Sequence, residues 1–206
     1  MNIDDIKFLF YTITHPINGF YEIRHHGKGN IKLSLLIVFL SGAAYCINRR
    51  YASFIVNPAD PMEVNSILII FSMFVLFFLF CLGNWSVTCL MNGEGRMQDI
   101  ITVTGYSLLP ILLMFIPATL FSQFVAADEQ TFYYLLINIA VIWGALLVIC
   151  SNMVIHNYTL TKELKTLILT LAAMVIILFI ILLFYTMFQQ LAEFIKSIYT
   201  ELIFRV

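Results

Sequence analysis

Long uncharged, apolar runs alternate along the chain with short charged segments. The runs cover residues 33–48, 64–93, 100–127, 130–161 and 166–192. An α-helix rises about 1.5 Å per residue, so about 20 residues cross the roughly 30 Å hydrocarbon core of a bilayer. Four runs exceed that length, and the first falls slightly short of it. The pattern predicts five membrane-spanning helices at residues 31–48, 66–90, 101–125, 132–154 and 167–189.

Helices are predicted rather than strands because lipid offers no hydrogen-bond partner to an unpaired backbone group. The strands of a membrane barrel would also need apolar and polar residues to alternate, and that alternation is absent. The fold class is therefore an all-α integral membrane protein, a five-transmembrane-helix bundle. The first span is the shortest, since Lys32 and Arg49 bracket only 16 uncharged residues. Its alternative is a re-entrant or interfacial segment, which would reverse the side on which every later loop lies.

Composition supports a membrane protein, argues against a soluble domain and gives no sign of a nucleic-acid partner. The chain has 206 residues, of which 61% are apolar and 11% charged, and its mean hydropathy is +0.94. A soluble domain usually carries about 25% charged residues. So few polar side chains cannot cover a soluble globule of this size. The net charge of −1 gives no basis for a nucleic-acid partner.

The distribution of Lys and Arg predicts the orientation in the membrane. One side would hold seven of them, in the N-terminal segment and in the second and fourth loops. The other side would hold four, including Arg49 and Arg50 in the first loop. Because cytoplasmic loops are richer in Lys and Arg, the N-terminus is expected in the cytoplasm and the C-terminus outside.

Both ends of the chain carry amphipathic segments. Ile6, Leu9, Phe10 and Ile13 share one helical face, and Pro16 then separates this segment from a second one. Residues 1–30 are therefore expected to form a cytoplasmic segment of two short interfacial helices, with no signal peptide. The alternative is a cap packed on the bundle. Residues 31–190 would form the membrane domain, and residues 191–206 an amphipathic C-terminal tail.

Apart from Lys32, at the very start of the first span, the predicted spans contain no Asp, Glu, Lys or Arg. A charge inside a span is costly and usually marks a proton relay, an ion pathway or a site for a charged substrate. We therefore expect no catalytic residues, no cofactor and no metal site. The four cysteines lie in apolar runs and are interpreted as buried hydrophobes, and the histidines as interfacial residues.

The densest polar pattern lies between the second and third spans, and it is the candidate functional motif. Asn92-Gly93-Glu94-Gly95 is predicted to be a tight turn, because both glycines tolerate positive φ. Asp99 would complement the dipole of the following helix. The full set of candidate residues is Asn84, Trp85, Gly93, Glu94, Gly95, Asp99, Gly105, Tyr106, Pro110 and Pro117.

Two prolines in the third span are expected to kink it. Pro110 and Pro117 lack an N–H group, so the carbonyls of Tyr106 and Leu113 would lose their usual partners. A neighbouring helix, a water or a ligand must then satisfy them. Neighbouring spans offer three donors: Asn84, Trp85 and Asn138. The region is either a neutral pocket or hinge beside Gly105 and Tyr106, or a kinked helix satisfied by its neighbours.

The combination of these features resembles the Yip-domain family of membrane proteins. The resemblance rests on five spans, on the turn from Trp85 through Gly93-Glu94-Gly95 to Asp99-Ile100, and on Gly105-Tyr106-Ser107-Leu108-x-Pro110. His15-Pro16 followed by Gly19-Phe20 also looks like the segment before the first span in short prokaryotic members. The resemblance covers roughly residues 12–190.

The resemblance implies a membrane architecture more than an activity. Eukaryotic relatives bind small Rab-type GTPases and carry an Asp-Leu-Tyr-Gly-Pro motif in a long cytosolic N-terminal region. This chain has no such motif, so binding of a small GTPase is not expected. For short bacterial relatives the family implies no established activity. The resemblance to them places the chain in a bacterial cell membrane.

Three functional hypotheses follow from the sequence. The first is a non-enzymatic protein that contacts the lipid bilayer and organises, or is an accessory subunit of, a membrane complex such as a transporter, or self-associates. The second is a channel or transporter that uses a neutral pocket near Tyr106 and Pro110. The third is membrane shaping by the amphipathic segments at the two ends.

Overall fold

The computed structural model describes residues 3–57 and 60–204. Within these ranges all regular secondary structure is helical. The elements are α1 (Ile3–Thr14), α2 (Pro16–His26), α3 (Ile31–Tyr51), α4 (Ser66–Leu90), α5 (Met97–Ser107), α6 (Leu109–Ser122), a 3₁₀ turn η1 (Ala127–Glu129), α7 (Gln130–His156) and α8 (Leu160–Phe204).

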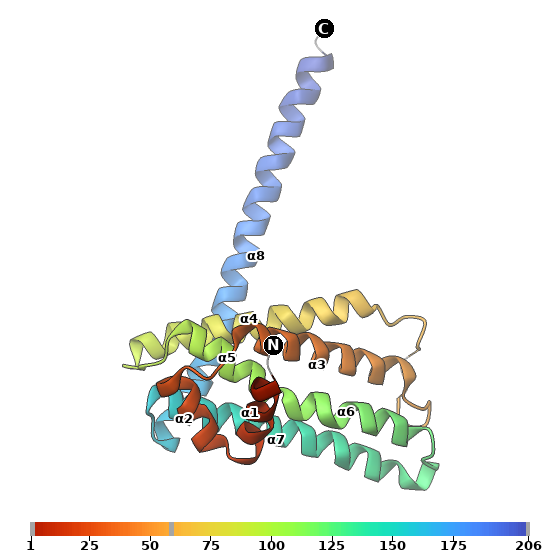
Figure 1. The fold of residues 1–206 in the computed structure, drawn as a ribbon. Helices are drawn as coiled ribbons and strands as arrows, with labels where there is room; N and C mark the ends of the chain where they lie inside the picture. Colours follow the sequence, from red (N-terminus) through yellow and green to blue (C-terminus); the bar gives the residue numbers. More distant parts are fainter. Residues whose placement is uncertain (1–2, 58–59, 205–206) are drawn as a thin grey trace.

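Among the described residues, five helical segments are long and apolar enough to cross a membrane, as the sequence predicts. They are α3, α4, the α5–α6 pair, α7 and α8. Figure 1 shows α3, α4, α6 and α7 running side by side, with the connecting loops at the two ends of the bundle. We call the end that carries residues 91–96 and 157–159 the hairpin end.

The first span is one unbroken helix of 21 residues. Asn30 begins it, because its side-chain oxygen accepts a hydrogen bond from the Lys32 N–H at 3.0 Å. Asn65 begins α4 in the same way and accepts from the Leu68 N–H at 3.2 Å. A continuous helix that packs along its neighbours favours a full crossing over the re-entrant alternative.

The third span is interrupted at Leu108 instead of kinking at both prolines. The Leu108 N–H donates to the Gly105 carbonyl at 3.1 Å, which closes α5 with a tight turn. Pro110 then lies in the first turn of α6, where a missing N–H costs nothing. Pro117 lies inside α6, which continues to Ser122.

The side-chain donor at this break also differs from the expectation. The Ser41 hydroxyl of α3 donates to the Leu108 carbonyl at 3.3 Å. Asn84, which the sequence offered as a donor, makes no side-chain hydrogen bond in the described structure, and Trp85 is 42% exposed. Asn138 is exposed on α7. The break is therefore stabilised by a small hydroxyl on α3, not by the larger polar side chains.

The two N-terminal helices pack on the bundle. Leu9 of α1 and Phe20 and Ile23 of α2 belong to the largest hydrophobic cluster, where they meet Val103 and Ile155 of the membrane domain. The outer surface of these helices also carries large apolar side chains, with Phe10, Ile17 and Tyr21 between 48% and 65% exposed. The structure thus combines the packed cap with an amphipathic outer face.

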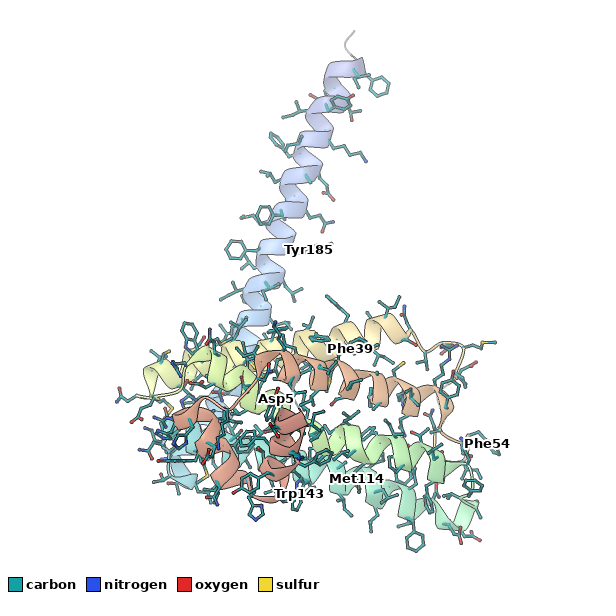
Figure 2. All side chains as sticks on the ribbon, in the orientation of Figure 1. Asp5, Phe39, Phe54, Met114, Trp143 and Tyr185 are labelled. Atoms are coloured by element: carbon teal, nitrogen blue, oxygen red, sulfur yellow. The ribbon has the colours of Figure 1, made fainter. Side chains whose placement is uncertain are left out.

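The last helix is much longer than a span and leaves the bundle. Its 45 residues correspond to about 68 Å, roughly twice the hydrocarbon core. It begins against α7, crosses α4 and then projects away at a steep angle, with side chains such as Tyr185 pointing outward (Figures 1 and 2). Every side chain from 178 to 201 is exposed. Residues 178–201 are called the arm, and the tail expected from residue 191 is a continuation of it.

Candidate functional site

The turn between α4 and α5 forms the centre of the hairpin end. The chain reverses through residues 91–96, and the Gly93 N–H donates to the Thr88 carbonyl at 2.7 Å. The left-handed residue of this turn is Asn92, with φ of 55°. Asparagine is among the residues that adopt this conformation at low cost. The prediction that Gly93 and Gly95 supply the positive φ is therefore wrong.

The two glycines are needed for close packing against the end of α7. A Cβ on Gly93 would lie 2.6 Å from His156 Nδ1 and 2.8 Å from the Thr88 Cβ. A Cβ on Gly95 would overlap the Ile155 side chain and lie 2.7 Å from His156 Cε1. These positions exclude any side chain, so the Gly-Glu-Gly sequence lets the turn lie directly on α7.

His156 fixes that contact by a hydrogen bond. Its Nδ1 accepts the Gly95 N–H at 3.2 Å, which requires the ring proton to be on Nε2. The residue is 1% exposed, so the expectation of an interfacial histidine is wrong. Its ring stacks on Tyr158, with 5.3 Å between the ring centroids.

Arg24 links α2 to the end of α7 and to the turn between α4 and α5. Its Nη1 donates to the Val154 carbonyl in the last turn of α7 at 3.0 Å. Its Nη2 forms an ion pair with the Glu94 carboxylate. The guanidinium also complements the negative end of the α7 dipole. Because the Arg24 side chain is only 15% exposed, both contacts are partly shielded from solvent.

Tyr158 holds the connection between α7 and α8 against the same turn. Its hydroxyl donates to the Met91 carbonyl at 3.1 Å, and Lys162 Nζ lies 3.9 Å from the centre of its ring. Burial raises the pKa of the Tyr158 phenol, so the hydroxyl keeps the proton that this hydrogen bond requires. The geometry is that of a cation–π contact beside a fixed hydrogen bond.

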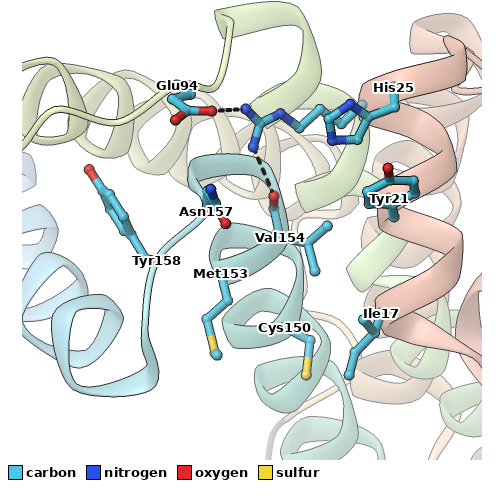
Figure 3. A pocket seen from close by; sticks show the side chains of 10 residues that line it. Ile17, Tyr21, His25, Glu94, Cys150, Met153, Val154, Asn157 and Tyr158 are labelled. Atoms are coloured by element: carbon cyan, nitrogen blue, oxygen red, sulfur yellow. Dashed lines mark hydrogen bonds and ion pairs between the residues drawn. The ribbon is translucent and has the colours of Figure 1, made fainter.

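A cavity of about 430 Å³ lies between α2 and α7 beside these contacts (Figure 3). Its wall is apolar along the helices and polar near the turn. The apolar part is formed by Ile17, Cys150, Met153 and Val154, and the polar part by Tyr21, Arg24, His25, Glu94, Asn157 and Tyr158. A wall of this composition suits an amphipathic molecule at the edge of the membrane. In the described part of the chain, no group of three His, Cys, Asp or Glu side chains is arranged to hold a metal ion.

Three other predicted residues have structural roles next to this end. Asp99 caps α5, since its Oδ2 accepts from the Arg96 N–H at 3.4 Å and from the Arg96 Nε at 3.1 Å. Tyr106 is 2% exposed, and its hydroxyl accepts the Asn30 N–H at 3.1 Å. Gly105 packs directly against Ser34 of α3. The contacts of Tyr106 and Gly105 fasten the start of α3 to α5.

The remaining candidate residues do not join the site. Trp85 is 42% exposed on the outer surface of α4. Pro110 is buried at the start of α6, and Pro117 is exposed near the other end of that helix. Asn84 is fully buried without a hydrogen bond. The motif predicted from sequence therefore separates into a turn that contacts α2 and α7, and residues that pack elsewhere.

Sequence reasoning missed the partners of the turn. The sequence pattern presents Arg24 only as a positive charge and His156 only as an interfacial residue, and it does not single out Tyr158. Their sequence separations from Glu94 and Gly95 are large, and a single sequence carries no signal for contacts at such distances.

Comparison with known proteins gives one match. Residues 10–185 match the family model described as the Yip1 domain. No curated protein and no solved structure matches the chain.

Proposed function

The chain belongs to the Yip1 domain family, and on this premise we propose that it is a non-enzymatic membrane protein that organises a larger membrane complex or is its accessory subunit. The observation that carries this proposal is the exposure of the whole arm. The rest of the molecule buries apolar side chains between helices, whereas the arm packs on no other described element over residues 178–201. Its surface is available to another polypeptide.

The composition of the arm suits contact between helices in a bilayer. Exposed aromatic side chains lie along it, at Phe179, Phe184, Tyr185 and Phe188. Lipid tails are as apolar as these side chains, so helix pairing in a membrane depends on shape and on polar contacts. Gln189 and Gln190 place two amides in the middle of the arm, and an amide there gains by pairing with a second helix.

Transport through a neutral pocket has less support. Tyr106 is 2% exposed and Pro110 is buried in helix packing, so neither residue lines a described cavity of the membrane domain. Membrane shaping rests on the exposed outer faces of α1 and α2. Because these two helices also pack on the bundle, we rank membrane shaping below the organising role that the arm supports.

Photocrosslinking in native membranes tests the proposed contact. A photoreactive amino acid would replace Phe188 on the arm, which is 62% exposed. The matched control is Ile142 on α7, which is 61% exposed on the bundle. We expect Phe188, and not Ile142, to give a discrete protein adduct whose mass identifies either another membrane protein or a second copy of this chain. Adducts with lipid alone at both positions would contradict the proposal, as would substrate turnover or flux by the purified protein in liposomes.

A further inference from the structure

The walls of the cavity between α2 and α7 change from apolar to polar along both helices. On α2 the lining residues are Ile17, then Tyr21, and then Arg24 and His25 toward the hairpin end. On α7 they are Cys150, Met153 and Val154, followed after the end of the helix by Asn157 and Tyr158. Figure 3 shows Ile17 beside Cys150, at the end of the cavity away from Glu94. The two helices therefore present the same gradient side by side.

This gradient matches the boundary of a bilayer. The sequence predicts that the span in α7 ends at residue 154, and Cys150 lies about 10 Å of helix before Asn157. The apolar part of the cavity would then lie among acyl chains and the polar part among headgroups. Ile17 is 65% and Tyr21 is 50% exposed, so the α2 wall is accessible from outside the bundle. A ligand that fits this cavity has an apolar part and a polar part in the same order as a membrane lipid.

The wall carries one arginine and one glutamate, whose charges have opposite signs. Arg24 and Glu94 form an ion pair, and Arg24 also donates to the Val154 carbonyl. A guanidinium has five N–H donors and a carboxylate has two acceptor oxygens. Within the described residues, the other N–H groups of Arg24 and Oε1 of Glu94 make no hydrogen bond. The cavity thus offers donors for an anionic group and, beside them, an acceptor for a cationic one.

Neutral side chains complete the polar wall. The His25 ring packs on Tyr21, with 4.2 Å between the ring centroids, and both residues line the cavity. Asn157, in the left-handed conformation that ends α7, adds an exposed amide. Imidazole, phenol and amide groups can all donate to phosphate or ester oxygens. The volume of about 430 Å³ lies in the range of small-molecule sites.

We propose that this cavity binds one phospholipid molecule with a phosphoethanolamine headgroup. The phosphate accepts hydrogen bonds from Arg24 and His25, and the primary ammonium group donates to Glu94. The acyl chains lie against Ile17 and Cys150 and continue into the bilayer. Because the charges of Arg24 and Glu94 balance, a zwitterionic headgroup complements the wall better than an anionic one. Bound lipid would connect α2 to α7 and so make the docking of the N-terminal helices depend on the lipid composition of the membrane.

Native mass spectrometry of the purified full-length protein in detergent tests the specificity. Phosphatidylethanolamine, phosphatidylcholine and phosphatidylglycerol with identical acyl chains would be added separately, and soluble phosphoethanolamine would be added as a competitor without acyl chains. A choline headgroup has the same two charges but no N–H to donate to Glu94. We expect one phosphatidylethanolamine per chain to bind about fivefold more tightly than either other lipid, because one ion pair with an exposed carboxylate is gained. The soluble headgroup should not compete, because it leaves the apolar wall uncovered.

Two matched variants assign the preference to Glu94. Glu94→Gln keeps the size of the side chain and removes its charge, so the preference over phosphatidylcholine should fall to about twofold or less. Glu22→Gln is the control, because Glu22 on α2 pairs with Lys28 and does not line the cavity. It should keep the full preference. Equal binding of the three lipids, tighter binding of phosphatidylglycerol, or competition by soluble phosphoethanolamine would overturn the proposal, as would loss of the preference in both variants.

Photocrosslinking locates the bound lipid on the wild-type protein, without any substitution. A phosphatidylethanolamine analogue with a photoreactive group in one acyl chain would be bound, irradiated and mapped by peptide mass spectrometry. We expect adducts in residues 16–26 and 147–157, and we expect excess unlabelled phosphatidylethanolamine, but not phosphatidylcholine, to suppress them. Adducts spread evenly over the exposed faces of the spans, or confined to the arm, would contradict the proposal, because the lipid would then only surround the protein.

Discussion

At the scale of single residues, glycines mark the positions where helices touch. A Cβ on Gly105 would lie 3.0 Å from both the Cβ and the carbonyl oxygen of Ser34, and closer still to its hydroxyl. At Gly42 the nearest atom to an added Cβ is the Met73 Cβ at 3.4 Å, an ordinary contact. The same substitution therefore has different consequences at two helical glycines of the membrane domain.

We expect Gly105→Ala to destabilise the protein by about 1–3 kcal/mol, because α3 and α5 must separate to accept the methyl group. Gly42→Ala should be neutral or slightly stabilising, since alanine favours the helix by about 1 kcal/mol over glycine. The midpoint of unfolding, followed by the fluorescence of Trp85 and Trp143, measures both. Equal stability of the two variants would show that α3 does not approach α5 as closely as described.

The sequence predicted which residues form the hairpin turn but not why they are glycines. The expected reason was backbone conformation, whereas the left-handed residue is Asn92 and the glycines make room for His156 and Ile155. Close approach depends on a partner that is about 60 residues away in sequence. Local chemistry can identify a turn, but a steric requirement becomes visible only when the second surface is in place.

At the scale of elements, α2 is fastened to the hairpin turn by one side chain with two partners. Arg24 donates to the Val154 carbonyl and pairs with Glu94, whose side chain is 58% exposed. An ion pair with an exposed carboxylate contributes at most about 1 kcal/mol, whereas a charged donor to a part-buried carbonyl contributes roughly 1.5–3 kcal/mol. Loss of both interactions of Arg24 should therefore have a larger effect than loss of the ion pair with Glu94 alone.

We expect Arg24→Ala to increase hydrogen exchange in residues 16–26 clearly more than Glu94→Ala does. Lys28→Ala, which removes the exposed pair with Glu22, is the control for loss of a surface charge and should change exchange little. Exchange by mass spectrometry in detergent measures all three. If Glu94→Ala matched Arg24→Ala, the ion pair and not the contact with α7 would hold α2 in place.

Hydropathy predicted the five long helices because burial in lipid requires long apolar runs, and α4 begins at residue 66 as expected. It did not predict the length of α8, since charges were used to end each span. Lys165 and Glu193 bound the last apolar run, but both lie inside α8, because both residues are good helix formers. The break at Leu108 was also missed, because Pro110 suits the first turn of a new helix as well as a kink.

At the scale of the whole molecule, five crossings would place the two ends of the chain on opposite sides of the membrane. The distribution of Lys and Arg predicts that the first loop and the C-terminal end lie outside and that the hairpin end lies in the cytoplasm. The arm makes this arrangement worth testing, because it leaves the bundle at a steep angle instead of running along the other helices (Figure 1). Its direction in lipid decides where its far end lies.

Accessibility of single cysteines in intact cells measures this arrangement. Ser53→Cys in the first loop and Ser197→Cys on the arm would be made in a chain whose own cysteines are replaced, and Cys89, exposed near the hairpin end, would be restored alone as the control. We expect a membrane-impermeant maleimide to label positions 53 and 197 in intact cells, and Cys89 only after permeabilisation. Labelling of 53 without 197 would mean that α8 does not cross. The arm would then lie along the bilayer, and its contacts with a partner would be made within one leaflet.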